Sequence, residues 1–367
     1  MQKSSPRLPL IDAFKAIASQ LILLHHLALY GPLSEATHRV IPDFFGWLES
    51  DARIAVQVFL VIGGFLAANS LAPNGILLAP HPLSQIKKRY FKLVIPFFSA
   101  VLFCVVASAI ARTLLIDDAI PDRPTWTQLA AHATLLHGVL GFDSLSAGVW
   151  YIAIDFQLFA LLLGLLWLAR STATHRQSAV ALLLVGLWAV ASLFHFNRDA
   201  DWDNWAIYFF GAYGLGALTF WLSQQDRRFL GLVGMALVVT LALAIDFRSR
   251  ILVALITALS LGLGQCSGLL ARWPNFRALA WLGKISYSVF LIHFPLILLA
   301  NAVFSQVAPT SPGIVLAWTI GTWASAVLAG AVFFRVVESR GAYWQSLLAA
   351  PLQTLTDRLS APLRSRP

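Results

Sequence analysis

Three ionisable side chains, Asp12, Lys15 and His26, interrupt the first apolar stretch of the chain, residues 8–30. At about 100° per helical residue, Lys15 and His26 fall about 20° apart around a helix, with Asp12 within about 60° of both. A charged group inside a bilayer costs at least about 2.5 kcal/mol, so a helix face with three ionisable groups predicts a chemical or transport site. The neighbouring His25 points about 100° away from that face.

Structural roles for the same residues stay open. An intramembrane histidine often hydrogen-bonds a neighbouring helix, and Asp12 and Lys15, three positions apart, can form an ion pair. The fourth apolar stretch holds a carboxylate, Asp155, five residues after Trp150. We expect Asp155 about 8 Å below the start of its span, at a depth comparable to His26. There it could orient the ring, hold a polar substrate group or complete a polar network.

Two further groups of polar residues stand at the starts of apolar stretches. Ser286, Tyr287 and His293 lie in the ninth stretch, where they could line a polar channel or serve only in helix packing. Arg89 and Lys92 precede the third stretch, where cationic side chains suit the phosphates of a ligand or set topology beside anionic lipids.

Membrane helices are the elements that must position these residues. The sequence is 58% hydrophobic and 12% charged, with a mean hydropathy of +0.74, as is typical of an integral membrane protein. We predict an all-α fold of about ten transmembrane helices, each long enough to cross about 30 Å of hydrocarbon. The predicted spans are 9–31, 54–72, 93–115, 148–169, 178–196, 204–222, 229–246, 250–270, 284–306 and 313–335.

The distribution of basic residues predicts the orientation of these spans. Most Lys and Arg residues fall in alternate loops, which the positive-inside rule assigns to the cytoplasm together with both termini. The net charge of +9 is therefore interpreted as orientation, with no nucleic-acid partner. Cys104 and Cys266 fall inside spans and no metal-ligand spacing is present, so we expect neither a structural disulfide nor a metal.

The order of these residues resembles the acyltransferase-3 family of bacterial membrane acyltransferases. That family opens with an Asp-x-x-Arg motif and a His eleven residues later, to which Asp12, Lys15 and His26 are similar, with Lys in place of Arg. The closest resemblance is the run Leu282–Pro295. The other matching segments are 58–65, with Gly63 in place of Ser; 88–92 with Pro96; Trp150 with Asp155, in place of Glu; and Glu338.

The resemblance implies transfer of an acyl group, typically acetyl from cytoplasmic acetyl-coenzyme A, to a hydroxyl of an envelope or exported glycan. Residues 1–340 would form the acyltransferase domain of a multi-pass protein in the bacterial inner membrane, and 341–367 a short cytoplasmic tail. His26 would be the general base on the acceptor hydroxyl, with Asp155 orienting the ring or the sugar; a covalent acyl-histidine intermediate is the open alternative. The expected donor-binding residues are Arg89, Lys92, Lys15, Ser286 and Tyr287, and the expected acceptor-binding residues are Trp150 and His293.

A second class of function is compatible with polar residues inside ten spans. A proton-coupled exporter or a glycan flippase would also place Asp, Lys and His in the membrane. Such transporters often show two related halves, and no internal repeat is evident here. The expected partners of an acyltransferase are membrane lipid, acyl-coenzyme A as donor, a glycan acceptor and proteins of polysaccharide biosynthesis.

Overall fold

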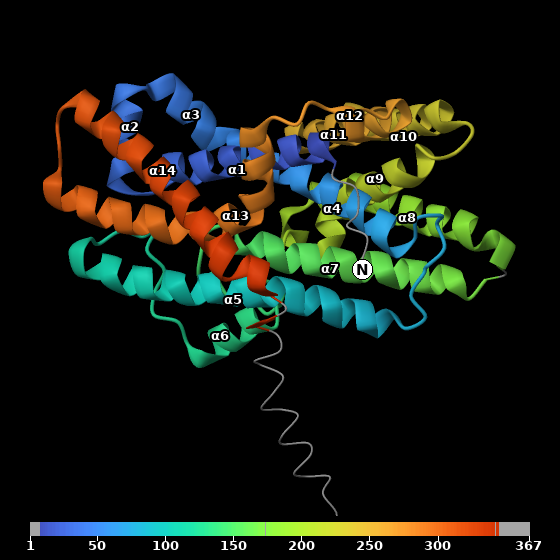
Figure 1. Cartoon of the computed structure of the whole chain (residues 1–367), viewed down its shortest axis with the longest axis horizontal. Helices are drawn as coiled ribbons and strands as arrows, with labels where there is room; N and C mark the ends of the chain where they lie inside the picture. The colour runs from blue at the N-terminus through green and yellow to red at the C-terminus, as the bar shows by residue number, and fades with distance from the viewer. Residues whose placement is uncertain (1–7, 173, 342, 345–367) are drawn as a thin grey trace, which may run out of the picture.

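The computed structural model describes residues 8–172, 174–341 and 343–344, and all regular structure in these ranges is helical (Figure 1). The α-helices are α1 Pro9–Leu29, α2 Gly31–Val40, α3 Pro42–Ser50, α4 Val56–Leu71, α5 Pro82–Leu114, α6 Trp126–Ala133, α7 Val149–Arg170, α8 Gln177–Phe194, α9 Ala206–Leu222, α10 Arg228–Ile245, α11 Ser249–Ser267, α12 Leu269–Arg272, α13 Arg277–Val307 and α14 Pro312–Val336. Short 3-10 turns are Ala52–Ala55, Thr174–Arg176, Phe196–Arg198, Ala200–Trp202 and Glu338–Arg340.

The predicted all-helical membrane class is confirmed. In the described ranges, nine helices are long and apolar enough to cross a membrane, and they coincide with nine of the predicted spans. The other predicted span, 204–222, forms α9, which has only 17 residues. The helices α4, α7, α8, α10 and α11 all pack against α9, so protein neighbours surround it.

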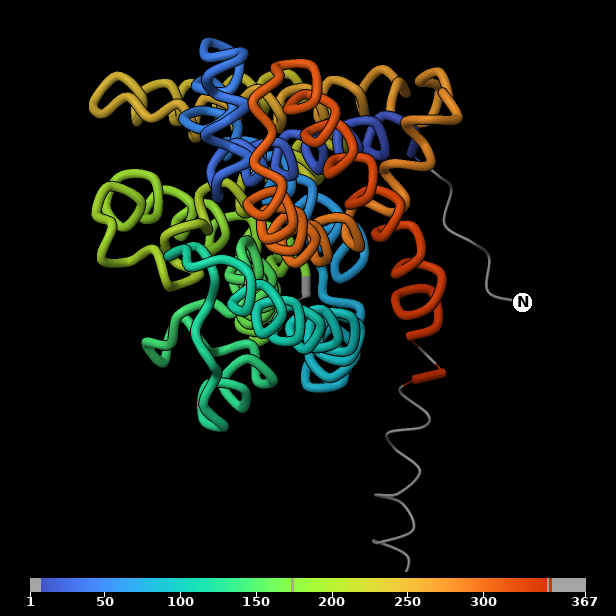
Figure 2. Tube along the Cα trace, turned by 90° about the vertical axis from the view of Figure 1, so that its left-hand side faces the viewer, coloured from blue at the N-terminus to red at the C-terminus, as the bar shows by residue number. Residues whose placement is uncertain are grey.

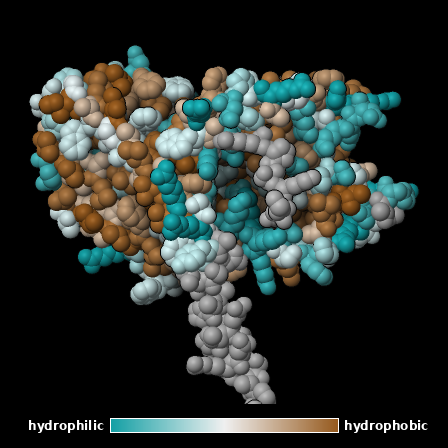
Figure 3. Space-filling model, viewed as in Figure 1, coloured by the Kyte–Doolittle hydropathy of each residue, from teal (hydrophilic) through white to brown (hydrophobic). Residues whose placement is uncertain are grey.

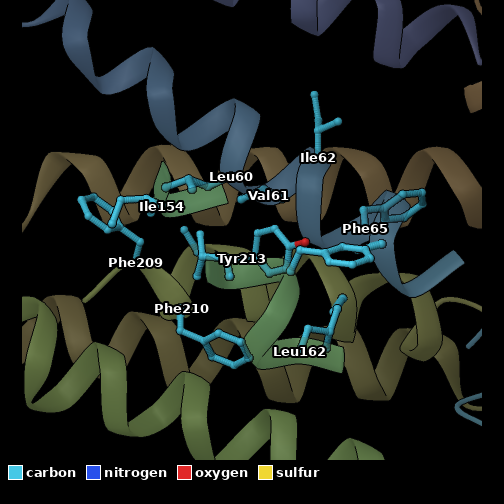
Figure 4. Packing of buried hydrophobic residues seen from close by; sticks show 14 of the residues in the cluster. Leu60, Val61, Ile62, Phe65, Ile154, Leu162, Phe209, Phe210 and Tyr213 are labelled. Atoms are coloured by element: carbon cyan, nitrogen blue, oxygen red, sulfur yellow. The ribbon is translucent and has the colours of Figure 1, made fainter. Parts of the chain in front are cut away.

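Small residues let α4 and α9 cross in close contact. A Cβ on Gly216 would overlap the backbone oxygen of Val61, and one on Gly64 would overlap that of Tyr213. Figure 4 shows the result, with the ring of Tyr213 in the centre of the packing and its hydroxyl directed toward α4, beside Phe65. The glycines of the sixth predicted span therefore serve helix packing.

Replacing Gly216 by Ala should destabilise the protein by roughly 1–3 kcal/mol, because the added methyl group must push two helix backbones apart. Gly234→Ala in α10 is the matched control, since a Cβ there meets no atom within 4 Å. Thermal unfolding of the purified protein in detergent measures both. Equal melting temperatures for the two variants would contradict the close crossing of α4 and α9.

Both ends of the described chain lie at the same end of the helix bundle. Lys15, near the start of α1, lies close enough to Glu338, just after α14, to interact with it electrostatically. We name this end, where α1, α5 and α13 begin, the basic end, and the opposite end, where α1 stops and α7 begins, the far end. The predicted tail over 341–367 lies almost wholly outside the described residues, so its place is untested.

The outer surface of the bundle is apolar over much of its area. Figure 3 shows hydrophobic side chains gathered over the part of this face where α13 and α14 lie, and Figure 2 places α14 on the side of the molecule opposite α8. Ile320, Leu328 and Val332 of α14 are each at least 60% exposed. Exposed apolar side chains in such numbers fit contact with lipid.

Candidate functional site

A buried histidine pair joins His26 of α1 to His293 of α13. His26 Nδ1 and His293 Nε2 are 2.7 Å apart, and the two rings stack with their centroids 4.9 Å apart. His26 is 7% exposed and His293 is fully buried. The sequence predicts substrate contact for His293; the structure gives it a hydrogen bond to the predicted base.

Close packing of two helices that begin at the same end of the bundle brings the pair together. A Cβ on Gly283 of α13 would overlap the backbone oxygen of Asp12 in α1, so these helices touch near the basic end. Ten residues later in α13, His293 reaches His26. The run Leu282–Pro295 thus contains both Gly283, which permits the close approach of α13 to α1, and His293, which hydrogen-bonds His26.

The hydrogen bonds fix the tautomer of both rings. His293 Nδ1 lies 3.0 Å from the carbonyl oxygen of Val289, and a carbonyl oxygen can only accept. In a neutral His293, Nδ1 therefore carries the proton and Nε2 accepts from Nδ1 of His26. His26 Nε2 is left with a free lone pair, and no described residue hydrogen-bonds it. This nitrogen can accept a proton from a substrate.

The start of α7 lies directly against the His26 ring. Gly148 precedes this helix with a φ of +81°, a left-handed conformation that favours glycine. A Cβ at Gly148 would stand 3.6 Å from His26 Cε1 and 3.1 Å from the ring of Phe290. In the first turn of α7, the Val149 and Tyr151 amides donate to carbonyl oxygens, whereas the Trp150 amide donates to no described residue. A hydrogen-bond donor is therefore available beside the base.

Asp155 lies deeper in the bundle than the sequence suggests. Gly148 is level with His26, and seven helical residues separate Asp155 from Gly148, which is about 10 Å along α7. The Asp155 carboxylate instead accepts a hydrogen bond from the Arg89 guanidinium and forms an ion pair with it. Asp155, expected at a depth comparable to His26, thus lies about 10 Å from the level of that ring, and the side chain that hydrogen-bonds His26 is His293.

The ion pair belongs to a group of charged side chains at the basic end, the basic-end cluster, made of Lys15, Arg89, Lys92, Asp155 and Glu338. Lys92 interacts electrostatically with Arg89, Asp155 and Glu338, and Lys15 with Glu338 and Lys92. Glu338 accepts a hydrogen bond of 2.5 Å from the Ser288 hydroxyl. Three helices, α1, α5 and α7, and the turn after α14 therefore bring together residues that the sequence separates by up to more than 300 positions.

Two atoms near the Arg89–Asp155 pair have no partner in the described part of the chain. Arg89 Nε and the Tyr213 hydroxyl are both buried and without a hydrogen bond. The Tyr213 ring and an Asp155 oxygen both lie beside Gly63, where the family pattern carries a serine. Unsatisfied buried polar atoms of this kind are costly, and a ligand or a water can satisfy them.

The predicted donor-binding hydroxyls already make bonds within the protein. Ser286 donates to the backbone oxygen of Gly283 at 3.0 Å, and Tyr287 donates to that of Leu93 at 3.2 Å. Each hydroxyl can still accept a bond from a ligand. Tyr287 also interacts electrostatically with Glu338 and Asp155, which places it beside the basic-end cluster.

Aromatic rings link the basic-end cluster to the histidine pair. Tyr151, which interacts electrostatically with Asp155 and Arg89, packs against Phe59 and Phe290 with centroid distances of 6.2 and 5.4 Å. Phe290 in turn lies 6.2 Å from His293. These three rings form an apolar partition between the two polar sites.

A cavity of about 750 Å³ opens at the far end. Trp150, predicted to contact the acceptor, lines it, and this residue directly follows the segment that touches His26. Arg53, another lining residue, lies within electrostatic range of His26. The polar and aromatic residues in its wall are Ser50, Asp51, Arg53, Gln57, His137, Phe142, Asp143, Ser144, Trp150, Gln157, Asp203, Asn204, Tyr208, Phe209, Phe247, Arg248, Ser249 and Arg250.

Sequence reasoning missed Gly148, Arg53 and His137. Gly148 is recognisable only by its left-handed backbone beside His26, which spacing along the chain does not reveal. Arg53 lies between the predicted spans 9–31 and 54–72, and His137 lies between 93–115 and 148–169. Their meeting in one cavity depends on how the helix ends are arranged in space.

Across the described ranges, no group of three or more His, Cys, Asp and Glu side chains is arranged to hold a metal ion.

Comparison with known proteins gives one match over nearly the whole chain. A family model described as an acyltransferase domain matches residues 8–336. A Caenorhabditis elegans protein named Regulator of hypoxia-inducible factor 1 is 24% identical over 172 residues, which cover 43% of this chain and 34% of that protein. No solved structure matches. On the match over residues 8–336, which contain every element of the site except Glu338, the chain belongs to the acyltransferase-3 family.

Proposed function

We propose that this multi-pass membrane protein transfers an acyl group, acetyl in particular, from cytoplasmic acyl-coenzyme A to a hydroxyl of an envelope or exported glycan in the bacterial inner membrane. The observation that carries the proposal is the free lone pair on His26 Nε2, which the hydrogen bonds of His293 hold in place. A positioned, unprotonated imidazole nitrogen is what a general base requires.

In the proposed reaction, His26 Nε2 accepts the proton of the acceptor hydroxyl as its oxygen attacks the thioester carbonyl. The carbon–oxygen bond forms, the carbon–sulfur bond breaks, and the departing thiolate takes the proton back from His26. The Trp150 amide, at the positive end of the α7 dipole, is placed to stabilise the negative charge on the carbonyl oxygen. In the acyl-histidine alternative, His26 Nε2 attacks the thioester carbonyl, a carbon–nitrogen bond forms, and the carbon–sulfur bond breaks to release the coenzyme A thiolate. The acceptor oxygen then attacks the acyl group, the carbon–nitrogen bond breaks to regenerate His26, and the hydroxyl proton goes to the thiolate.

The donor would bind at the basic end, with its phosphates near Lys92 and Lys15. Lys92 is exposed, whereas Arg89 is already paired with Asp155, so Lys92 is the cation most available to a phosphate. Lys15 precedes His26 by eleven residues, which is about 16 Å of helix. The long pantetheine arm would cover this distance past Ser286, Tyr287 and the aromatic partition, and bring the thioester to His26.

The proposal is tested with purified protein in sealed vesicles, supplied with labelled acetyl-coenzyme A on one side and envelope glycan on the other. We expect label to become ester-linked to the glycan and free coenzyme A to accumulate in equal amount. Movement of glycan between compartments without ester formation would instead identify a flippase or an exporter.

His293 should act as a positioning residue for His26. His293→Leu removes the acceptor for the His26 Nδ1 proton, so the ring can adopt the wrong tautomer, and we expect kcat to fall about 10- to 100-fold. His293→Gln can keep an acceptor oxygen at that position and should recover most of the lost rate. Equal losses in both variants, measured as initial rates of labelled acyl transfer, would show that His293 serves packing alone.

A further inference from the structure

The far-end cavity contains hydrogen-bond donors that the protein leaves without acceptors. Arg250 Nε is buried and has no partner among the described residues, although its Nη2 donates to the Asn197 backbone oxygen at 2.7 Å. Both ring nitrogens of His137 are likewise buried and unpartnered. Burial, and then the neighbouring His132, lower the pKa of His137 to about 3, so this ring is neutral at pH 7 and keeps one N–H donor.

Two of the three cavity arginines have no ion pair within the described ranges. Arg248 pairs with Asp246 at 3.4 Å and donates to Asn197 and Leu193, so it is engaged. Arg250 lies over the Tyr208 ring at 4.9 Å, and Arg53 makes neither an ion pair nor a hydrogen bond with any described residue. The two arginines without an ion pair therefore differ: Arg53 is exposed at the cavity and in electrostatic range of His26, whereas Arg250 is partly buried and its Nε has no acceptor in the described part of the chain.

The carboxylates of the same wall differ in their setting. Asp51, Asp143 and Asp203 are all exposed, so water can solvate them at the mouth of the cavity. There these carboxylates need no cation beside them, and they can accept hydrogen bonds from sugar hydroxyls. Trp150, Tyr208 and Phe209 add aromatic faces on which a sugar ring can stack.

We propose that this cavity binds the acceptor, and that the acceptor is a hydroxylated, sugar-like molecule with an anionic group, a carboxylate or a phosphate, which Arg53 and Arg250 recognise. That the ligand is the acyl acceptor rests on the proposed function. That it is anionic is argued separately, from the cavity arginines that lack an ion pair. The volume of about 750 Å³ is in the range of pockets for molecules of a few rings. An anion bound at Arg53 would hold the neighbouring hydroxyls near His26.

Three probes with the same ring scaffold test the proposal: methyl glucuronide, glucose 6-phosphate and the neutral methyl glucoside. Binding to the full-length protein in lipid nanodiscs is measured by ligand-observed saturation-transfer NMR, without donor. We expect the better of the two anionic probes to bind at least tenfold more tightly than the glucoside. Which of them binds better identifies the anionic group as a carboxylate or a phosphate.

Arg53→Gln and Arg250→Gln should each reduce binding of the preferred anionic probe about tenfold and leave the glucoside unchanged. Arg53 forms no hydrogen bond or ion pair with the described residues, so its replacement should spare the fold. Replacement of Arg39, an exposed arginine outside the cavity, by Gln is the matched control. Equal binding of all three probes, binding of none, or an anion preference that survives Arg53→Gln would overturn the proposal.

The same measurements separate this proposal from the proposed function. His26→Asn should bind the anionic probe as tightly as the unchanged protein, because the side chain that it alters is not among the residues that hold the anion. A protein that transfers acyl groups but shows no anion preference would refute the anionic acceptor alone. An anion preference without acyl transfer would refute the acyltransferase alone.

Discussion

His26→Asn should lower the rate of acyl transfer by about 10²- to 10⁴-fold, the usual contribution of a general base. The asparagine side-chain amide can still donate a bond in place of His26 Nδ1, so the contact with His293 survives while the basic nitrogen is lost. Initial rates with labelled acetyl-coenzyme A in membranes give the measurement, at equal amounts of folded protein.

His25→Asn is the matched control for this experiment. His25 is also buried, and its Nδ1 donates to the Leu48 backbone oxygen at 2.9 Å, a bond that asparagine can retain. We expect less than a threefold loss of rate. Comparable losses in the two variants would show that the effect comes from disturbing α1 and would remove His26 from the chemistry.

Arg89→Met should destabilise the protein by about 2–4 kcal/mol, because it leaves the Asp155 carboxylate buried without its cation. This range is somewhat below that for a fully buried pair, since 26% of the Arg89 side chain is exposed. The double variant Arg89→Met with Asp155→Leu should recover most of the loss, because it removes both charges. Thermal unfolding in detergent is measured for the unchanged protein, the single variants Arg89→Met and Asp155→Leu, and the double variant. Together these four proteins form a double-mutant cycle.

Lys92→Gln separates donor binding from this structural effect. Lys92 is exposed and should leave the melting temperature nearly unchanged while it weakens the binding of acetyl-coenzyme A. If Arg89→Met leaves stability intact and Lys92→Gln leaves donor affinity intact, then neither the structural pair nor the donor site is where we place it.

Much of the fold follows from hydropathy, because long apolar runs have few alternatives to helices in lipid. The predicted spans agree with helices of the structure to within a few residues at most ends. The helices α5 and α13 are the exceptions: they begin at Pro82 and Arg277, well before the apolar residues do. Charged turns of these helices extend beyond the apolar runs, and hydropathy alone does not detect them. Hydropathy is also incomplete for the short α9, which is apolar because neighbouring helices enclose it.

The site was predicted less completely, for reasons that lie in three-dimensional packing. His26 could be recognised from its place among apolar residues, and Asp155 and Arg89 from their unusual positions. Asp155 pairs with Arg89, and His293 bonds His26, because of how far α7 and α13 are displaced along their axes relative to the neighbouring helices. A displacement of two helical turns changes every partner, and a single sequence carries no direct signal of it.

The most direct test of the central claim is the ester content of envelope glycans, measured by mass spectrometry. It compares cells in which the gene is deleted with the same cells complemented by one of three forms of the gene. We predict that the unchanged gene and His25→Asn restore an acyl ester that the deletion removes, and that His26→Asn does not. Restoration of the ester by His26→Asn, or an ester content that the deletion leaves unaltered, would contradict the account.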